Sequence, residues 1–401
     1  MSMASDQSED PAVTNFRTYL QINTSQPKPD YGEAIMFYMT MAQEIGLDFK
    51  TVEVAAGKDM AILTWRGQEP SLPSVMLYCH TDVVPVFPEH WKYDPFGAVK
   101  DENGDIYARG AQDMKCLGIQ YLEAIRQLKK EGSKPKRTVH IIFGPDEEIG
   151  GKEGMALFVQ RQEFPDLNIG FALDEGLASP TSEFRLFYGE RACWWFSVTF
   201  SGKPGHGSAF IEDTAISKLN KVMNRALQFR AEQEKRLNSD SSLTLGDVTS
   251  LNINLLQGGV QYNVVPSEMT AGFDVRITPT VDLKKFEEEI TQWCKDAGPD
   301  FTIKFFQKGM CQKRTSTDSS DPWWAAFSSA CQSMGLELKK EIFPAGTDGR
   351  YLRELDIPVL GFSPMNNTPI LLHDHNEFLN EKVFLRGIKI YEKIIPALAN
   401  V

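Results

Sequence analysis

The stretch from Val139 to Gly151 reads VHIIFGPDEEIGG and decides how the chain folds. An apolar, β-branched run that stops at a Gly-Pro pair is typical of a buried strand, and residues 139–143 fit that pattern. The acids at 146–148 therefore follow the carboxyl end of a strand, the edge of an open α/β sheet where ligands bind. Glycines at 150 and 151 let a helix start close behind, and we expect one near 152–161. The acids form either a solvated turn or part of a cation site.

Composition limits the class of protein. The chain has 401 residues, of which 42% are hydrophobic and 24% charged, which allows two or three globular domains. Its net charge of -12 argues against a nucleic-acid partner, because phosphate binding needs clustered Lys and Arg. No apolar run reaches the length of about 18 residues that a membrane span needs. The six cysteines lack C-x-x-C spacing and no secretory signal precedes them, so we expect a cytoplasmic protein.

A recurring unit in the chain is an apolar strand followed at once by acids or a histidine. Its repetition predicts an α/β fold, with a mixed, mostly parallel sheet flanked by helices and with polar side chains on one rim. Asp113 stands just before an amphipathic helix expected at 115–130, where a carboxylate is either an N-cap or a ligand. The candidates on the rim are His80, Asp82, Asp113, Glu147, Glu148, Asp174, Glu175 and His373.

The pattern of elements changes near residue 190. From there the order is β-α-β-β-α-β, the split βαβ unit of ferredoxin-like domains. The α/β pattern resumes with a helix near 322–334 and ends with a helix near 381–397. We therefore expect residues 1–188 and 311–401 to form one discontinuous domain, and residues 189–310 to form an inserted α+β domain.

The ligand types on the rim indicate a metal site. Imidazole and carboxylate ligands without cysteine suit zinc or a similar divalent ion. Two ions need one bridging carboxylate and about two further ligands each, and the candidate set supplies that number with three acids left over. Asp174 and Glu175 are adjacent in a strand and face opposite ways, so only one of them reaches the metal, and spacing alone does not say which.

Six short motifs, in order along the chain, resemble the M20 family of co-catalytic zinc hydrolases. They are HTD from His80, RGAQDMK from Arg109, PDEEIGG from Pro145, GHGS from Gly205, GTDGR from Gly346 and LLHDH around His373. Each motif is weak alone, but the ordered set is specific and spans nearly the whole chain. The resemblance implies zinc-dependent hydrolysis of N-acyl-L-amino acids, chiefly N-acetyl, to a free amino acid and a carboxylate. It also implies that the insert is a lid that mediates homodimerisation.

Position by position, the resemblance implies two Zn²⁺ per subunit in the discontinuous catalytic domain. The matching ligands are His80 and Glu175 at one zinc, Glu148 and His373 at the other, and Asp113 as the bridge. Glu147 matches the general base, which takes a proton from the metal-activated water. Asp82 lies two residues beyond His80, so we expect its carboxylate to accept the other ring N–H and orient the imidazole. The alternative for Asp82 is an acid that only shapes the turn.

Further residues match positions that meet the substrate in the family. His206 matches a lid histidine that donates to the oxyanion, although Gly207 stands where some relatives have alanine. Whether His206 acts in its own subunit or in the partner is open. Arg350 can bind the substrate α-carboxylate through two N–H groups. Asn263 and Arg276 match lid residues, but Arg276 is equally well explained as a solvent-facing strand residue.

Two other functions remain open. The first is a dipeptidase or exopeptidase that uses the same metal centre on the same fold. The second is a catalytically silent binding protein that keeps the fold. The second alternative leaves Glu147 without a purpose, because a binding protein has no need of a base behind the ligands.

Overall fold

The computed structural model describes residues 9–401. The chain divides into two compact units. The first comprises Met1–Tyr188, Thr315–Lys340 and Thr347–Val401, and the second comprises Gly189–Arg314 and Glu341–Gly346. Within the described residues, no helix combines the length and the apolar content that crossing a bilayer would require.

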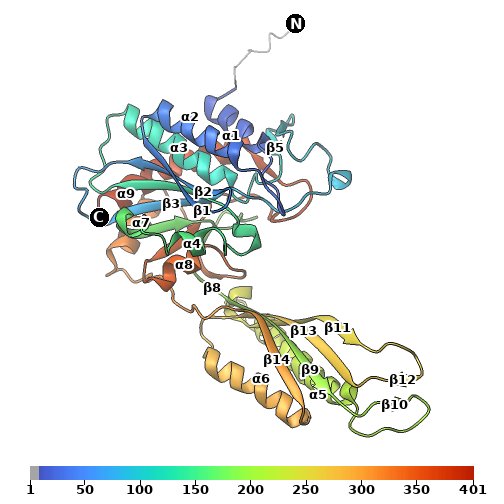
Figure 1. The fold of residues 1–401 in the computed structure, drawn as a ribbon. Coiled ribbons are helices and arrows are strands. Elements are labelled where there is room, and N and C mark those ends of the chain that lie inside the picture. Colours follow the sequence, from blue (N-terminus) through green and yellow to red (C-terminus); the bar gives the residue numbers. More distant parts are fainter. Residues whose placement is uncertain (1–8) are drawn as a thin grey trace. The chain divides into compact units, whose positions relative to one another are not determined.

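The main sheet has eight strands (Figure 1). From one edge to the other they are β1 (Asp48–Ala55), β2 (Lys58–Trp65), β6 (Val139–Gly144), β3 (Ser74–His80), β7 (Ile169–Asp174), β16 (Val359–Phe362), β8 (Phe184–Glu190) and β15 (Leu338–Phe343). The opening stretch of the sequence is therefore β6, which lies inside the sheet and is buried along its whole length. The expectation of an α/β fold with a mixed sheet is confirmed.

The expectation that this sheet is mostly parallel is wrong outside its centre. Strands β6, β3, β7 and β16 are parallel neighbours. The pairs β1–β2, β2–β6 and β16–β8 are antiparallel. The reason at one edge is local, because β1 and β2 are joined by a two-residue turn, and so tight a turn connects only antiparallel strands. Gly57 in that turn has φ 70°, a conformation that suits glycine.

Helices cover both faces of the sheet. One face packs against α1 (Pro11–Gln21), α2 (Gly32–Ile45), α3 (Lys115–Lys130), α7 (Pro322–Ser333) and α9 (Glu381–Ala399). The other face packs against α4 (Met155–Phe158) and α8 (Gly349–Glu354). The helix expected at 152–161 is only the single turn α4. Gly150 and Gly151 both have positive φ values and continue the loop instead of starting a helix.

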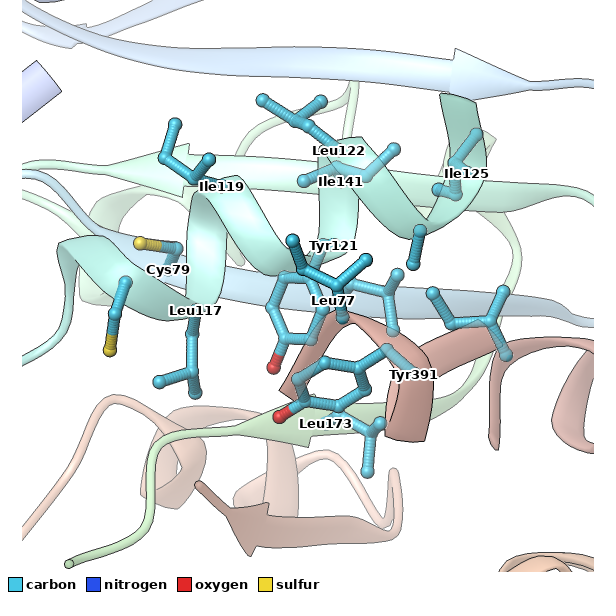
Figure 2. Packing of buried hydrophobic residues seen from close by; sticks show 14 of the residues in the cluster. Leu77, Cys79, Leu117, Ile119, Tyr121, Leu122, Ile125, Ile141, Leu173 and Tyr391 are labelled. Carbon is cyan, nitrogen blue, oxygen red and sulfur yellow. The ribbon is translucent and has the colours of Figure 1, made fainter. Parts of the chain in front are cut away.

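The larger core lies between the sheet and helices α3 and α9. Figure 2 shows Tyr121 of α3 and Tyr391 of α9 near Leu77 and Leu173 of the sheet. The two tyrosine rings meet at a centroid distance of 4.6 Å. Because α3 begins at Lys115, this packing also places Asp113 at the carboxyl ends of the central strands.

Short elements complete the first unit. A small sheet has the order β17-β5-β4, with β17 (Phe378–Asn380), β5 (Asp105–Tyr107) and β4 (Val99–Lys100). Short 3₁₀ helices are η1 (Pro88–His90), η2 (Glu147–Ile149) and η3 (Pro165–Leu167), and a further one, η4 (Leu245–Asp247), lies in the second unit. The small sheet matters for the site because it pairs the segment before Asp113 with the segment after His373.

The second unit is an antiparallel sheet with the order β11-β13-β9-β14. Its elements are β9 (Ala192–Ser201), α5 (Ala215–Ser239), β11 (Ser250–Gly258), β13 (Glu268–Ile277), α6 (Leu283–Ala297) and β14 (Phe301–Lys308). A two-stranded ladder of β10 (Gly205–His206) and β12 (Val264–Val265) follows. Along β9, alternate side chains such as Trp194 and Phe196 are buried in a core shared with α5 and α6. The side chain of Trp195 points the other way and is 44% exposed.

Candidate metal centre and active site

The acid loop after β6 is held in place by its first acid. Asp146 is buried in the left-handed conformation, with φ 67°. Its carboxylate accepts a hydrogen bond of 2.8 Å from the Tyr31 hydroxyl and pairs with the Lys58 ammonium. Asp146 is thus a structural anchor, and the next two acids lie on the short helix η2, which turns sharply at Gly150.

Two groups of possible metal ligands meet at one carboxylate. His80 Nε2 lies 3.0 Å from Asp113 Oδ1 and 3.8 Å from Glu175 Oε2. His373 Nε2 lies 3.2 Å from Asp113 Oδ2 and 3.0 Å from Glu148 Oε2. In each group the donor atoms all lie within 4.8 Å of one another. The structure therefore brings together all the residues that the resemblance implies as ligands, and Asp113 gives one oxygen to each group.

These donors fit divalent cations. Glu148 Oε1 is buried and has no hydrogen-bond partner among the described residues. A buried carboxylate oxygen without a partner is costly unless a cation binds it. Burial, followed by the charge of Asp113, raises the pKa of Glu148 to about 7. Several carboxylates this close repel one another, and a shared metal ion removes that repulsion.

The carboxylates of the site favour positive charge on the histidines, as the pKa values of His373 and Asp113 indicate. Hydrogen bonds with Asp113 and then Glu148 raise the pKa of His373 to about 10. Burial alone would raise the pKa of Asp113, but its hydrogen bonds with His373 and His80 hold that pKa well below its usual range. A metal ion on these atoms would replace the imidazole proton as the positive partner of the carboxylates.

The role expected for the Asp82 carboxylate is wrong in detail. His80 Nδ1 lies 2.9 Å from the main-chain carbonyl oxygen of Asp82, and the carboxylate oxygen Oδ1 is 3.8 Å away. The carboxylate instead accepts the backbone N–H groups of Glu147, at 3.1 Å, and Glu148, at 3.2 Å. The reason is that β3 ends at His80, so the alternation of a strand no longer places Asp82 beside the ring.

The structure separates the roles of Asp174 and Glu175. Asp174 Oδ1 accepts the backbone N–H of Glu175 at 2.8 Å, and Oδ2 accepts that of Gly349 at 2.9 Å. Both of its oxygens are thus bonded to the backbone. Glu175 belongs to the group with His80, so Glu175 is the residue placed to bind metal.

Glu147 lies beside the two groups but belongs to neither. Its side chain is half-buried on η2. Burial, followed by the charge of Glu175, raises the pKa of Glu147 well above its usual range. A carboxyl with a raised pKa that is not a ligand suits a general base.

Arg350 is held against the acid loop. Its Nη1 donates to the Thr347 carbonyl at 2.6 Å, and its Nη2 donates to the Gly150 carbonyl at 2.7 Å. The guanidinium also stacks over the ring of Tyr351, at 4.6 Å from the ring centroid. The structure thus places Arg350 next to the loop that carries Glu147, with part of its donor capacity directed to the backbone.

The three residues expected in the insert lie in two places. The Asn263 carbonyl accepts the Gly207 N–H at 2.8 Å, so Asn263 adjoins His206, and both side chains are exposed. Arg276 pairs with Cys193 near the start of β9, whereas His206 follows the other end of that strand. The strand between them spans roughly 25 Å. Arg276 is also bonded to Asp274, with Nε 2.7 Å from Oδ1, so the second unit does not bring Arg276 to His206.

Residues 76–397 match the family described as Peptidase family M20/M25/M40. The chain belongs to this family. It is 57% identical to Aminoacylase-1B of Rattus norvegicus and 56% identical to Aminoacylase-1 of Homo sapiens, in each case over 100% of this chain and 98% of the relative. Its fold is similar to that of the M20 family metallo-carboxypeptidase of Sulfolobus solfataricus, with a TM-score of 0.73, 18% identity, and coverage of 98% of this chain and 100% of that one.

In this M20 chain, two buried carboxylates beside the site, Glu377 and Asp348, are not among the candidates that the sequence predicts. Glu377 is fully buried and bonds to the loop that leads to Asp113. Asp348 accepts a hydrogen bond of 2.5 Å from the Tyr78 hydroxyl, and burial raises the pKa of Asp348 to about 7. The sequence signal for Glu377 is its position, four residues after the candidate ligand His373. The signal for Asp348 is its place inside the GTDGR motif, two residues before Arg350.

Proposed function

We propose that this M20 chain is a zinc-dependent amidohydrolase that cleaves N-acyl-L-amino acids, chiefly N-acetyl, to a free L-amino acid and a carboxylate. The observation that carries the proposal is the pair of histidine–carboxylate groups that share Asp113, with Glu147 beside both groups and in neither. The substrate class follows from the full-length similarity to aminoacylase-1 enzymes.

The proposed centre binds two Zn²⁺ per subunit. One site would use His80, Glu175 and Asp113, and the other would use Glu148, His373 and the second oxygen of Asp113. When bound, the two ions would polarise the amide carbonyl and lower the pKa of a water molecule to about 7. The chain contributes the fixed positions of the ligands, because Asp113, His80 and Glu175 are all buried.

Glu147 would move the proton. Its carboxylate takes the proton from the attacking water while the oxygen of that water forms a bond to the amide carbon. As the carbon–nitrogen bond breaks, the carboxyl returns the proton to the leaving nitrogen, so the amino acid departs as an amine and Glu147 is again ionised. The Asp82 carboxylate holds the backbone N–H of Glu147 during these steps.

His206 and Arg350 would bind the two oxygen-bearing ends of the substrate. The Ser208 N–H points at His206 Nδ1, at 3.3 Å, which favours the tautomer with its hydrogen on Nε2. That N–H can donate to the developing oxyanion. Arg350 would bind the α-carboxylate, and Asn263 and Arg276 would contact the rest of the substrate.

The inserted domain at 189–310 would act as a lid and as the surface of a homodimer. Its β10–β12 end, which carries His206, also carries the fully exposed side chains of Phe210, Val260 and Tyr262. Large apolar side chains gathered at an exposed end are typical of an interaction surface. His206 follows the carboxyl end of β9, whereas Arg276 of β13 pairs with Cys193 near the other end of β9, so a site that uses both is most simply built from two subunits.

Glu147→Gln and Glu148→Gln together test this function. The first variant should keep its zinc and lose roughly 100- to 10,000-fold in kcat, because the base is gone and the ligands remain. The second should lose zinc first. Zinc content by elemental analysis, with turnover of N-acetyl-L-methionine in zinc-replete buffer, checks both. Loss of a zinc equivalent in Glu147→Gln would make Glu147 a ligand and refute its role as the base.

A matched substrate pair tests the specificity. N-acetyl-L-methionine and glycyl-L-methionine differ only by an ammonium group, which glycyl carries on the carbon that is the methyl group of acetyl. We expect the higher kcat/KM for the acetyl compound, and abolition of both activities by a chelator. A higher value for the dipeptide would favour the peptidase alternative. A chain that binds zinc but hydrolyses neither compound would favour the silent binding protein.

A further inference from the structure

The loops that carry Asp113 and His373 are hydrogen-bonded to each other through residues that are not ligands. The β5–β17 ladder pairs Tyr107 with Phe378. The Ala108 N–H then donates to the Glu377 carbonyl at 3.1 Å, which extends the contact toward the site. The two chain segments therefore run side by side up to the point where each supplies a candidate ligand.

The Glu377 side chain lies at the centre of the hydrogen bonds between these two loops. It is 0% exposed. Its Oε1 accepts the backbone N–H of Gln112 at 2.6 Å and that of Asp113 at 3.2 Å. Its Oε2 accepts the Gly110 N–H at 3.0 Å and the Arg109 guanidinium at 2.9 Å. One carboxylate thus accepts the N–H of the shared ligand and those of Gly110 and Gln112 in the segment before it.

Arg109, which forms an ion pair with Glu377, also contacts the main chain of the second candidate ligand, His373. Arg109 is 3% exposed, and its Nη2 lies 3.4 Å from the His373 carbonyl oxygen. Gln112 completes the link from the other side, because its amide donates to the Phe378 carbonyl at 2.9 Å and accepts the Leu371 N–H at 3.1 Å. The Arg109–Glu377 pair is therefore bonded to the main chain of both Asp113 and His373.

Stability of the fold alone explains this arrangement poorly. A buried ion pair is often no more stabilising than apolar residues of the same size. The Glu377 carboxylate does more than pair with Arg109, because it also accepts backbone donors from the loop of a ligand that must face two histidines at once. Residues that orient ligands in this way typically contribute 10- to 100-fold in metal affinity or activity.

We propose that Glu377 is a positioning residue of the metal centre, which sets the Asp113 carboxylate between His80 and His373 by holding the N–H groups of Gln112 and Asp113. The inference rests on the proposed function, in that Asp113 binds both metals. Its contribution is to metal affinity, through the backbone of Asp113, and not to the proton transfer.

Two variants separate backbone positioning from the ion pair. Glu377→Met keeps the volume and removes both acceptor oxygens. Glu377→Gln combined with Arg109→Met also removes the ion pair, but leaves one amide oxygen able to accept from Gln112 and Asp113. Zn²⁺ affinity of the full chain, measured by competition with a chromogenic chelator, is the readout, with the thermal midpoint of the chelator-treated protein measured alongside.

We expect Glu377→Met to bind Zn²⁺ 10- to 100-fold more weakly than wild type, and the double variant to recover most of that loss. Equal losses in the two variants would assign the effect to the ion pair and overturn the proposal. Wild-type affinity in Glu377→Met, combined with a lower thermal midpoint, would leave Glu377 a purely structural role and also overturn it. If Glu377→Met does not fold, a double variant that folds but binds Zn²⁺ 10- to 100-fold more weakly than wild type overturns the proposal by itself.

Two controls complete the design. Asp101→Asn is the matched control, because Asp101 Oδ1 also accepts two backbone N–H groups, of Asn103 at 2.9 Å and Asp105 at 3.0 Å, in an exposed turn. Its Zn²⁺ affinity should equal that of wild type. Asp113→Ala tests the underlying assignment. If Asp113→Ala binds Zn²⁺ normally, the proposed metal centre is wrong, which is a different failure from normal binding by Glu377→Met alone.

Discussion

The imidazole of His80 is oriented by the main chain of Asp82, whose carbonyl oxygen lies 2.9 Å from Nδ1. Donation from Nδ1–H to this carbonyl fixes the ring orientation and leaves Nε2, which faces Asp113 and Glu175, as the nitrogen that can bind a metal ion. The Asp82 carboxylate is thereby available to the acid loop, where it accepts the N–H groups of Glu147 and Glu148. One residue thus supports both sides of the centre, one through its backbone and the other through its side chain.

Asp82→Asn should weaken the Glu148 side of the centre more than the His80 side. The substitution keeps the carbonyl that holds His80 but turns an amide NH₂ toward one of the loop N–H groups. We expect a 10- to 100-fold loss in Zn²⁺ affinity or in activity. Combining it with His373→Ala should add little to the zinc loss of His373→Ala alone, because both changes act on one site. Additive zinc losses would show that Asp82 acts mainly through His80.

Arg350→Lys should discriminate against substrates with a free α-carboxylate. A lysine ammonium cannot reproduce the two parallel N–H donors of a guanidinium. We expect kcat/KM to fall much more for N-acetyl-L-methionine than for its amide. Arg350 also donates to the carbonyls of Thr347 and Gly150, so a structural role is the competing explanation. Equal losses on acid and amide would favour that role.

His140 should make the stability of the fold depend on pH. Burial lowers the pKa of His140 to about 4, against the opposite effect of a hydrogen bond with the backbone of Leu167, and the charges of Lys50 and Arg66 lower it further. The Nδ1 atom of the ring is hydrogen-bonded to the Thr64 hydroxyl at 2.9 Å. The unfolded chain binds this proton near pH 6.5, so between about pH 6.5 and 4 the unfolded state carries more protons than the folded state. The contribution of neutral His140 to the free energy of unfolding is therefore fully present above about pH 6.5. It is lost as the pH falls towards 4, and the free energy of unfolding decreases by roughly 3 kcal/mol at most.

Comparison with His140→Gln isolates this effect. Glutamine can keep a hydrogen bond to Thr64 but does not titrate. Urea unfolding of both proteins at several pH values should show the wild type losing stability relative to the variant as the pH falls below about 6.5. Because the metal ligands are the same in both proteins, their own pH dependence cancels in the difference. Curves that stay parallel would contradict the lowered pKa.

How far the sequence predicts this protein depends on whether an element has a local signal. The helix at α3 and the buried strand β6 have strong periodicity, and both appear where the sequence places them. Strand β1 has no clear pattern in the sequence, because its polar residues, such as Lys50 and Glu53, interrupt the alternation, and it is specified by pairing with β2. Residue types at strand ends give the candidate ligands, and the family resemblance selects five of them, whereas the bonds of Glu377 to the Asp113 loop join residues far apart in sequence and have no local signal.

The His206 side chain should act in the partner subunit of a homodimer. The proposed ligands lie in the first unit and His206 lies in the second. An exposed end that carries both this histidine and the apolar side chains of Phe210 and Tyr262 is suited to meet another copy of the chain. The competing arrangement is a subunit whose lid serves its own site. Phe210→Ser with Tyr262→Ser should lower activity through weaker pairing, which sedimentation at several protein concentrations can check.

Mixing two inactive variants decides between the two arrangements. His206→Ala and Glu147→Gln are unfolded together in equal amounts and refolded with zinc. If His206 acts in trans, half of the dimers are heterodimers, and each has one site with both groups intact, so activity should recover to about a quarter of wild type by random pairing. If His206 acts in cis, no subunit regains both groups. Activity that stays at the level of the separately refolded variants, while wild-type protein refolds normally in the same buffer, would exclude the trans arrangement.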